Sequence, residues 1–344
     1  MIDNNLLIKG DNIVALQWLL DNGYEGKIDL VYIDPPFATG GVFAIDNDGR
    51  VATISKSNNA VIAYKDTLQG KEFIDFLRQR ITLIHKLLSD KGSLYLHIDY
   101  KIGHYVKVML DEIFGYKCFR NDITRIKCNP KNFDRIGYGN IKDLILFYTK
   151  GDKPIWNDPR FKHTEKEIIK GYPKIDKNGR RYTTVPIHAP GESKSGETSK
   201  PFKGILPPAG RHWRCSIAEL EALDKAGLIE WSANGNPRKI NYADEMSGKK
   251  AQDIWDFKDP VYPDYPTQKN EDMLRFIVSA SSNEDSIVLD CFCGSGTTLK
   301  SAEDLGRRWI GVDKSDMAIE ITKKRLTGSD LFNFQNNSFI IKEL

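Results

Sequence analysis

The sequence has little of what marks secreted, membrane-bound or metal-binding proteins. Its 344 residues include only five cysteines, none in a paired Cys-x-x-Cys spacing: Cys118, Cys128, Cys215, Cys291 and Cys293. This odd, scattered set argues against a disulfide framework and indicates no metal site. No apolar run is long enough to span a bilayer, and the first residues lack the basic and apolar regions of a secretory signal. We therefore expect a protein of the reducing cytoplasm with no membrane partner.

Charge is distributed unevenly along the chain. The formal net charge is only +3, but residues 151–250 hold 19 lysine and arginine residues against 13 aspartate and glutamate residues. That segment therefore carries +6 and the rest of the chain −3. Charge alone leaves two interpretations open: a polyanionic partner, and a solvated basic surface.

The two ends of the chain alternate between helical and strand patterns. Apolar residues recur at helical spacing over 72–88, and apolar runs rich in β-branched residues predict strands over 28–33 and 93–98. The alternation stops after Lys150 and resumes near Glu271. It predicts an α/β fold, with a mostly parallel sheet and helices on both faces. The predicted segments are a first part over 1–150, an inserted domain over 151–266 and a second part over 267–344.

The predicted strand at 28–33 ends in Asp34-Pro35-Pro36-Phe37. Proline has no backbone donor and a fixed φ, so the strand cannot continue through Pro35 and Pro36. What remains is a rigid turn that presents a carboxylate, a free carbonyl and an aromatic ring. The two oxygens can accept N–H bonds from a flat, amine-bearing ring, and Phe37 can stack on its face. The turn therefore favours chemistry on the amine of a nucleobase.

A second motif follows the predicted strand at 286–289. Asp290-Cys291-Phe292-Cys293-Gly294-Ser295-Gly296-Thr297 leads from this strand into a helix, and its glycines let backbone N–H groups approach a ligand. It lacks the Gly-Lys-Ser/Thr of a phosphate-binding loop and the third glycine of a dinucleotide site. The next strand ends at Asp313, roughly where a carboxylate reaches ribose hydroxyls. An acidic residue at each strand end favours a cofactor with an amine and a ribose, such as S-adenosylmethionine.

The two motifs suit a single reaction. The exocyclic amine of adenine is a poor nucleophile because its lone pair is delocalised into the ring. Hydrogen bonds from this amine to Asp34 and to the Pro35 carbonyl would free the lone pair, and Asp34 would stabilise the nitrogen as it becomes positive. The sulfonium methyl of the cofactor is already an activated electrophile. In a DNA duplex the base would have to flip out of the stack.

Both motifs resemble those of the amino-methylating DNA methyltransferases, and their order, with an insertion between them, resembles the β class. Further stretches that support this resemblance are 10–12, 92–99, 143–150, 265–269 and 305–311. The insertion is similar to the target-recognition part of site-specific adenine methyltransferases of the type III modification subunit kind, over 210–213, 234–238, 244–245 and 253–255. The resemblance covers nearly the whole chain.

The resemblance implies a Rossmann-like S-adenosylmethionine-dependent methyltransferase fold with an inserted target-recognition domain. It implies that Asp34, Pro35, Pro36 and Phe37 hold the target base. The residues it implies at the cofactor are Asp11, Asn12, Asp34, Thr267, Gln268, Lys269, Asp290, Phe292, Gly294, Ser295, Gly296, Thr297 and Asp313. Among these, Asp290 would lie near the amino-acid end of the cofactor, Asp313 at its ribose, and 267–269 over its methionine portion.

The partner implied is double-stranded DNA, in a bacterial cytoplasm and in association with the nucleoid. The resemblance leaves open whether a restriction subunit is a partner and whether the chain forms a homodimer. The recognised DNA sequence does not follow from the sequence, because base readout depends on a few side chains on an unknown scaffold. Two residues depart from the family pattern: Cys291 stands where proline is usual, and Phe37 where tyrosine is commoner.

Several alternatives stay open. Methylation of the 4-amino group of cytosine would use the same mechanics, although cytosine enzymes more often carry serine at the position of Asp34. A DNA-binding module without catalysis, and a protein methyltransferase acting on a side-chain amide, are two further classes. Singly, Asp290 also suits a helix N-terminal charge and Asp313 a strand-end cap.

Two other groups of residues have a simple structural interpretation. His97 lies at the end of a predicted strand beside the proposed site, and we expect a structural role for it. Arg211-His212-Trp213-Arg214 mixes charge with an aromatic ring, as DNA-contacting segments do. The alternative for that segment is a buried tryptophan flanked by surface arginines.

Overall fold

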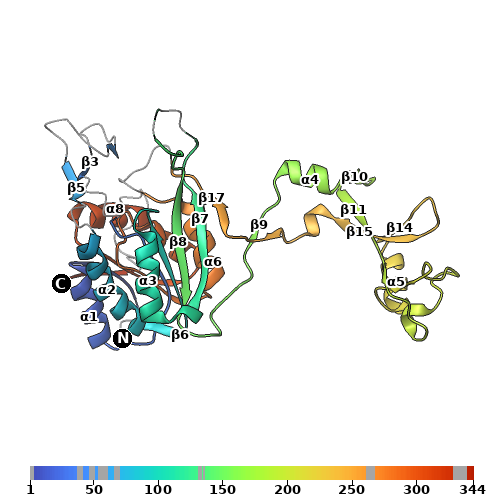
Figure 1. Ribbon diagram of the computed structural model, residues 1–344, viewed down its shortest axis with the longest axis horizontal. Helices are drawn as coiled ribbons and strands as arrows, with labels where there is room; N and C mark the ends of the chain where they lie inside the picture. Colours follow the sequence, from blue (N-terminus) through green and yellow to red (C-terminus); the bar gives the residue numbers. More distant parts are fainter. Residues whose placement is uncertain are drawn as a thin grey trace. The chain divides into compact units, whose positions relative to one another are not determined.

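The computed structural model describes residues 4–36, 42–45, 51–52, 61–65, 70–130, 134, 136–260, 268–327 and 339–344. Phe37 and Thr267, both expected at the site, lie outside these ranges. The chain forms two compact units (Figure 1). One comprises Met1–Pro159 with Gln252–Leu344, and the other comprises Arg160–Ala251.

The first unit is built on a nine-stranded sheet. Its strands are β1 (Asn5–Lys9), β2 (Ile28–Ile33), β6 (Leu88–Ile98), β7 (Phe119–Ile126), β8 (Lys142–Thr149), β17 (Ile254–Asp256), β18 (Ile287–Asp290), β19 (Arg308–Asp313) and β20 (Phe339–Glu343). Their order is β17-β7-β8-β6-β2-β18-β19-β1-β20. Only β8 pairs antiparallel with its neighbours, β6 and β7. The predicted mostly parallel α/β sheet is confirmed.

Helices lie on both faces of this sheet. Helices α1 (Asn12–Asp21), α2 (Gly70–Leu87) and α3 (Gly103–Phe114) lie side by side on one face (Figure 1). Leu94 and Leu96 of β6 face this layer, so Tyr95 between them points the other way. Its hydroxyl lies 2.8 Å from Ser281 Oγ of α6 (Glu271–Ser281), which therefore covers the opposite face. Two further helices, α7 (Thr297–Asp304) and α8 (Asp316–Thr327), complete the set described in this unit.

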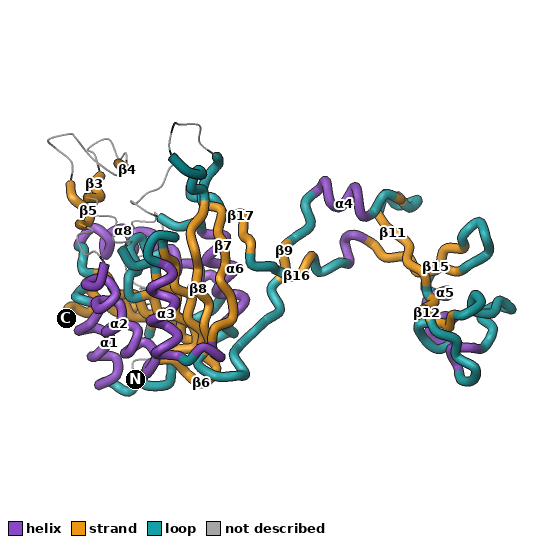
Figure 2. Tube along the Cα trace, viewed as in Figure 1, coloured by secondary structure: helices purple, strands orange, loops and turns teal. Residues whose placement is uncertain are grey.

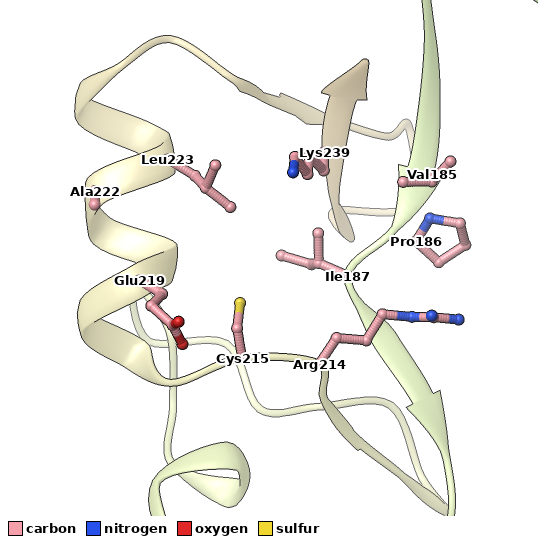
Figure 3. A pocket seen from close by; sticks show the side chains of 9 residues that line it. All are labelled: Val185, Pro186, Ile187, Arg214, Cys215, Glu219, Ala222, Leu223 and Lys239. Carbon is pink, nitrogen blue, oxygen red and sulfur yellow. The ribbon is translucent and has the colours of Figure 1, made fainter. Parts of the chain in front are cut away.

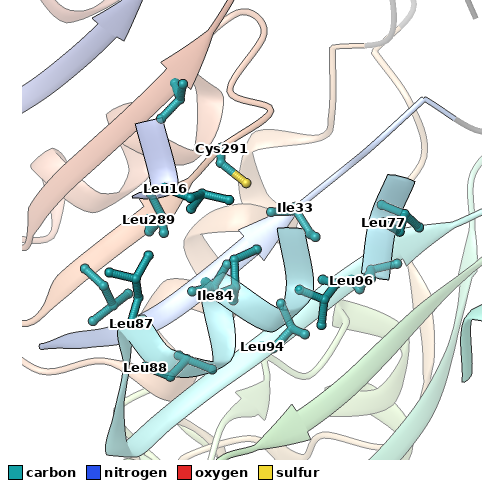
Figure 4. Close-up of a cluster of buried hydrophobic side chains, with 14 of the residues drawn as sticks. Leu16, Ile33, Leu77, Ile84, Leu87, Leu88, Leu94, Leu96, Leu289 and Cys291 are labelled. Atoms are coloured by element: carbon teal, nitrogen blue, oxygen red, sulfur yellow. The ribbon is translucent and has the colours of Figure 1, made fainter. Parts of the chain in front are cut away.

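The main hydrophobic core fixes the strand ends that carry the two motifs. Ile33 of β2 and Leu289 of β18 lie in one cluster with Leu16 of α1 and Ile84 of α2 (Figure 4). Cys291, the first residue of the glycine loop, belongs to the same cluster. Each buried aliphatic side chain contributes about 1.5–3 kcal/mol. The turn after Ile33 and the loop after Leu289 are therefore held by shared packing.

The second unit consists of short elements joined by loops (Figure 2). Its elements are β9 (Arg160–Phe161), α4 (Glu165–Gly171), β10 (Lys174–Ile175), β11 (Arg181–Pro186), β12 (His188–Pro190), β13 (Arg211–Trp213), α5 (Ile217–Lys225), β14 (Ile229–Trp231), β15 (Pro237–Tyr242) and β16 (Lys249–Lys250). Strands β10, β11, β15 and β14 form one antiparallel sheet, β12 pairs with β13, and β16 pairs with β9. A small separate core comprises Ile187, Phe202, Trp213 and Leu220.

The second unit is narrower than the predicted insertion of 151–266. Before it, the Asn157 amide donates to the carbonyls of Ser279 and Ser282, each at 2.9 Å, which ties the approaching chain to α6. After it, Trp255 is 5% exposed and packs edge-on against Phe276, with ring centroids 5.3 Å apart. Both flanks therefore pack with the first unit.

A further three-stranded antiparallel sheet comes from the region between β2 and α2. It comprises β3 (Val42–Ile45), β4 (Val51–Ala52) and β5 (Val61–Lys65) in the order β4-β3-β5. Across the described part of the chain, no helix combines the length and the apolar character needed to cross a membrane.

Candidate active site

Four parallel strands bring the predicted site residues to one edge of the sheet. Strands β2 and β18 are neighbours, with Val31 opposite Leu289. Because the two strands are parallel, Asp34 and Asp290 follow at the same edge. Strands β19 and β1 end there too, with Asp313 paired to Lys9. Ligands of open α/β sheets bind outside such carboxyl ends, at the place where the strand order reverses.

Asp34 has one paired and one unpaired carboxylate oxygen. Its Oδ2 lies 2.7 Å from the Lys269 ammonium, and the two side chains are 16% and 11% exposed. Its Oδ1 is buried and accepts no hydrogen bond from the described residues. An unsatisfied buried acceptor costs about 1–3 kcal/mol. Asp34 is therefore arranged to receive a donor from a ligand.

His97 supports the strand end behind Asp34. It is fully buried, and its Nε2 lies 3.3 Å from Asp143 Oδ2. A carboxylate only accepts, so Nε2 carries the proton and Nδ1 accepts from the Tyr32 hydroxyl at 2.9 Å. Burial lowers the pKa of His97, which keeps the imidazole neutral. With Nδ1 occupied as an acceptor, the contact of 4.0 Å to Asp34 Oδ1 supplies no hydrogen bond.

Asp143 connects this histidine to two basic side chains. Its Oδ1 lies 2.6 Å from Lys127 Nζ, and its Oδ2 lies 3.7 Å from Arg125 Nη1. Burial alone would raise the pKa of Asp143, but the bonds to His97 and Lys127 hold it well below its usual range. The fully buried Arg125 also binds Asp259 and donates to the Phe257 carbonyl at 2.8 Å. No local sequence pattern predicts this network, because its members lie on separate strands.

The glycine loop requires glycine at position 296. Gly294 and Gly296 have φ values of +51° and +73°. A Cβ on Gly296 would lie 2.7 Å from side-chain atoms of Thr322, which is too close. The Gly294 N–H donates to Asp313 Oδ2 and the Ser315 N–H to Asp313 Oδ1, each at 2.9 Å. Asp313 therefore braces the loop from the end of β19.

Asp290 is a buried carboxylate that favours a cation. It is 2% exposed, and it accepts from the Phe292 N–H at 3.0 Å and from the Thr298 hydroxyl at 2.6 Å. Burial raises the pKa of Asp290 to about 7, and the nearby charge of Asp34 acts in the same direction. A positively charged ligand group would favour its ionised form.

Arg80 binds Asp11 and Asn12, two of the residues predicted at the cofactor. Arg80 itself was not among the predicted site residues. The arginine is 5% exposed, lies 3.1 Å from Asp11 Oδ1, donates to Asn12 Oδ1 and covers the Phe76 ring at 3.5 Å. The Asn12 amide in turn donates to the Cys291 carbonyl at 3.1 Å. A signal was present, because Arg80 occupies a position that the helical pattern of 72–88 assigns to the apolar face.

The other predicted site residues fall into three groups. Ser295 and Thr297 are buried, with their hydroxyls 3.1 Å apart, and Phe292 is half-buried against Phe76. Pro35 is buried and Pro36 half-buried in the turn after β2. Gln268 is half-buried and immediately precedes Lys269. The structure thus brings the described members of both predicted sets to the same sheet edge.

The chain is similar in sequence to one protein family and to several known proteins. A family described as DNA methylase matches residues 28–324. The type II methyltransferase M.EcaI of Enterobacter cloacae is 41% identical over 93% of this chain and 69% of its own length. The Mod subunit of the type III restriction-modification enzyme StyLTI of Salmonella typhimurium is 28% identical over 92% of this chain. The chain spans 53% of that subunit.

A solved structure shares the fold. The PvuII DNA methyltransferase, described as cytosine-N4-specific, superimposes with a TM-score of 0.51, covering 95% of this chain and 88% of that one. The two sequences are 15% identical, so the similarity concerns architecture alone.

Proposed function

The chain belongs to the N6/N4 DNA methylase family, and on this premise we propose that it methylates the 6-amino group of adenine within a specific DNA sequence. S-Adenosylmethionine is the methyl donor of this chemistry and supplies an activated methyl group. The target base would leave the duplex stack to reach Asp34 at the sheet edge.

The main support for this proposal is the environment of the Asp34 carboxylate. Its Oδ2 already binds an ammonium, that of Lys269, at 2.7 Å, and its buried Oδ1 lacks a donor among the described residues. An exocyclic amine becomes positive as it gains a methyl group, so a carboxylate fixed beside it stabilises the transition state. The Pro35 carbonyl, next along the turn, is the second acceptor that we assign to the amine.

The cofactor would lie over the glycine loop, beside this turn. The residues present suit it, because Asp290 is a buried acid that favours a cation and the Gly294 N–H holds the loop to Asp313 at the end of the neighbouring strand. We assign Asp290 to the amino-acid end of the cofactor and Asp313 to its ribose. Asp11 and Asn12, fixed by Arg80, would line the same site from the end of β1.

Nucleoside analysis tests the reaction and the base together. DNA incubated with the protein and methyl-labelled S-adenosylmethionine is digested and separated into nucleosides. We expect the label in N6-methyldeoxyadenosine, because the motif begins with Asp34 and not with serine. Label in N4-methyldeoxycytidine would contradict the base assignment, and unlabelled DNA would contradict the reaction.

The second unit would supply target recognition. We propose that Arg160–Ala251 binds the DNA around the target base, and that the protein is the modification component of a restriction-modification system in a bacterial cytoplasm. The names of the relatives, a type II methyltransferase and a type III Mod subunit, support this setting. A restriction subunit and a second copy of the chain remain proposed partners.

A further inference from the structure

The second unit concentrates positive charge that its own carboxylates do not fully neutralise. Residues 160–251 hold 18 lysine and arginine residues against 11 aspartate and glutamate residues, a net charge of +7. Some of these cations have acidic partners. Examples are Lys174 with Glu230, Arg180 with Asp244 and Glu245, Lys203 with Asp224, and Lys249 with Glu167.

Two arginines of the second unit, Arg211 and Arg214, differ from these paired cations. Arg211 and Arg214 are exposed, and neither forms an ion pair with a carboxylate of the described residues. Both are anchored on one residue of the paired strand. Arg211 Nη1 lies 3.2 Å from His188 Nδ1, and Arg214 Nε donates to the His188 carbonyl at 3.2 Å. Both guanidinium groups thus contact the same residue of β12, which is paired with β13.

The charge of a third arginine, Arg238, also acts on His188. Arg238 of β15 donates to the Thr184 hydroxyl at 2.9 Å and to the Thr184 carbonyl at 2.7 Å. Burial lowers the pKa of His188, and the charges of Arg211, Arg214 and Arg238 lower it further. The imidazole is therefore neutral and accepts from Arg211 Nη1. We call these four residues the arginine cluster.

Nearby carboxylates are engaged elsewhere. Glu230 is opposite Arg238 in the sheet, but its oxygens bind Lys174 and the Tyr182 hydroxyl. Glu219 projects from α5 on the other side of Cys215 from Arg214, across a pocket of about 560 Å³ (Figure 3). Its carboxylate accepts from the N–H and the hydroxyl of Ser216, each at 2.8 Å. Arg211 and Arg214 therefore keep positive charge that no carboxylate of the described residues pairs with, which favours binding of an anion.

Trp213, between the two arginines, does not offer a stacking surface. It is fully buried against Phe202, and its indole N–H donates to the Lys200 carbonyl at 2.9 Å. The structure therefore matches the alternative of a buried tryptophan flanked by surface arginines. Trp213 therefore offers no aromatic face to a base, whereas the two flanking arginines offer charge and hydrogen-bond donors.

We propose that Arg211 and Arg214 bind phosphate groups of the DNA backbone and thereby set the position of the duplex on the second unit. Each guanidinium uses one N–H group on His188, which leaves a fork of donors suited to a phosphate. Such contacts orient DNA without reading its sequence. This inference rests on the proposed function, because it takes duplex DNA as the substrate.

The salt dependence of DNA binding tests this inference. Affinity of the full chain for a mixed-sequence duplex is measured by fluorescence anisotropy over a range of salt concentrations. A plot of log K against log salt concentration has a negative slope, and each lost phosphate contact reduces its magnitude by about 0.9. We expect a slope reduced by about 1 in Arg211→Gln and in Arg214→Gln, and by about 2 in the double variant.

Arg180→Gln is the matched control. It removes the same charge from the same unit, but its guanidinium is already bound to Asp244 and Glu245. We expect its slope to equal that of the wild type, and Arg211→Lys with Arg214→Lys to keep most of the slope. Thermal unfolding checks that each variant is folded.

The outcomes separate this inference from the proposed function. Wild-type protein that binds no duplex at any salt concentration contradicts DNA as substrate. Wild-type binding with unchanged slopes in both glutamine variants, or an equal loss in Arg180→Gln, overturns the arginine cluster alone. A lysine double variant with the wild-type slope but an altered sequence preference would also overturn it, because the arginines would then read bases.

Discussion

The Lys269 ammonium lies 2.7 Å from Asp34 Oδ2, at the carboxylate that we assign to the target amine. The family resemblance places Lys269 over the methionine portion of the cofactor, and its contact with Asp34 does not follow from the sequence. The target amine has to replace this lysine, or share the carboxylate with it, before methyl transfer. The pair also neutralises Asp34 in the protein alone.

A double-mutant cycle measures the strength of this pair. We expect Lys269→Met and Asp34→Asn to show a coupling of about 1–3 kcal/mol in urea unfolding, because both side chains are largely shielded from water. The control cycle is Lys258→Met with Asp256→Asn, an exposed pair 3.8 Å apart, which should couple by less than about 1 kcal/mol. Equal coupling in the two cycles would refute the shielded pair.

Cofactor binding should depend on pH through Asp290. Burial raises the pKa of Asp290 to about 7, above its ordinary value, so the carboxyl is mostly neutral below that pH. We expect S-adenosylmethionine affinity, measured by calorimetry, to fall as pH decreases through about 7, because the cationic amino group binds the ionised form. In the protein alone the sign is opposite: the contribution of this carboxyl to stability is lost as pH rises toward about 7.

Two variants distinguish Asp290 from other titrating groups. Thr298→Val removes a hydrogen bond that favours the ionised carboxylate, so the midpoint of cofactor binding should move to higher pH. Asp290→Asn should bind weakly and without this pH dependence. An Asp290→Asn profile that still follows the wild type would assign the titration elsewhere.

The glycine loop can be tested with two glycines of equal φ. Gly296 and Gly306 both have φ of +73°, but a Cβ would meet Thr322 at 2.7 Å only in Gly296, whereas Gly306 has open space. Gly306→Ala should cost about 1–2 kcal/mol from the left-handed backbone alone. Gly296→Ala should cost clearly more and weaken cofactor binding. Equal losses in urea unfolding would show that the loop yields to the added methyl group.

Arg80 should matter far more than its neighbour Arg78 on the same helix. Arg80 is 5% exposed and bonded to Asp11 and Asn12, whereas Arg78 forms an exposed pair with Glu112. We expect Arg80→Met to cost about 2–3 kcal/mol in unfolding free energy and to weaken cofactor binding. Arg78→Met should change stability by less than about 1 kcal/mol. Similar effects of the two substitutions would argue against a role for Arg80 in fixing the strand end.

The sequence predicted the sheet edge well because the signals there are local. Asp34-Pro35-Pro36 ends one strand and the glycine loop follows another, and the α/β rhythm implies parallel strands whose ends meet. Arg80 was also detectable, as an arginine in an apolar helical position. The limits of the second unit were not, because they depend on tertiary contacts: Asn157 donates to backbone carbonyls at the end of α6, and Trp255 packs against the α6 side chain of Phe276.

Other features depended on tertiary contacts that no local pattern encodes. The hydrogen bonds and ion pair that run from Tyr32 through His97 and Asp143 to Arg125 join four different strands of the sheet. The ion pair of Lys269 with Asp34 likewise joins the two chain segments that make up the first unit. Periodicity gives the faces of elements, but it does not give partners across a sheet.

The rate of single-turnover methyl transfer by Asp34→Asn tests whether the charge of Asp34 stabilises the methylated nitrogen. The substitution keeps the shape of the side chain but removes the charge that stabilises the methylated nitrogen. We expect methyl transfer from S-adenosylmethionine to DNA to be slowed by roughly 10²-fold or more, with cofactor binding retained. Transfer at the wild-type rate, with the same cofactor affinity, would contradict this role of Asp34.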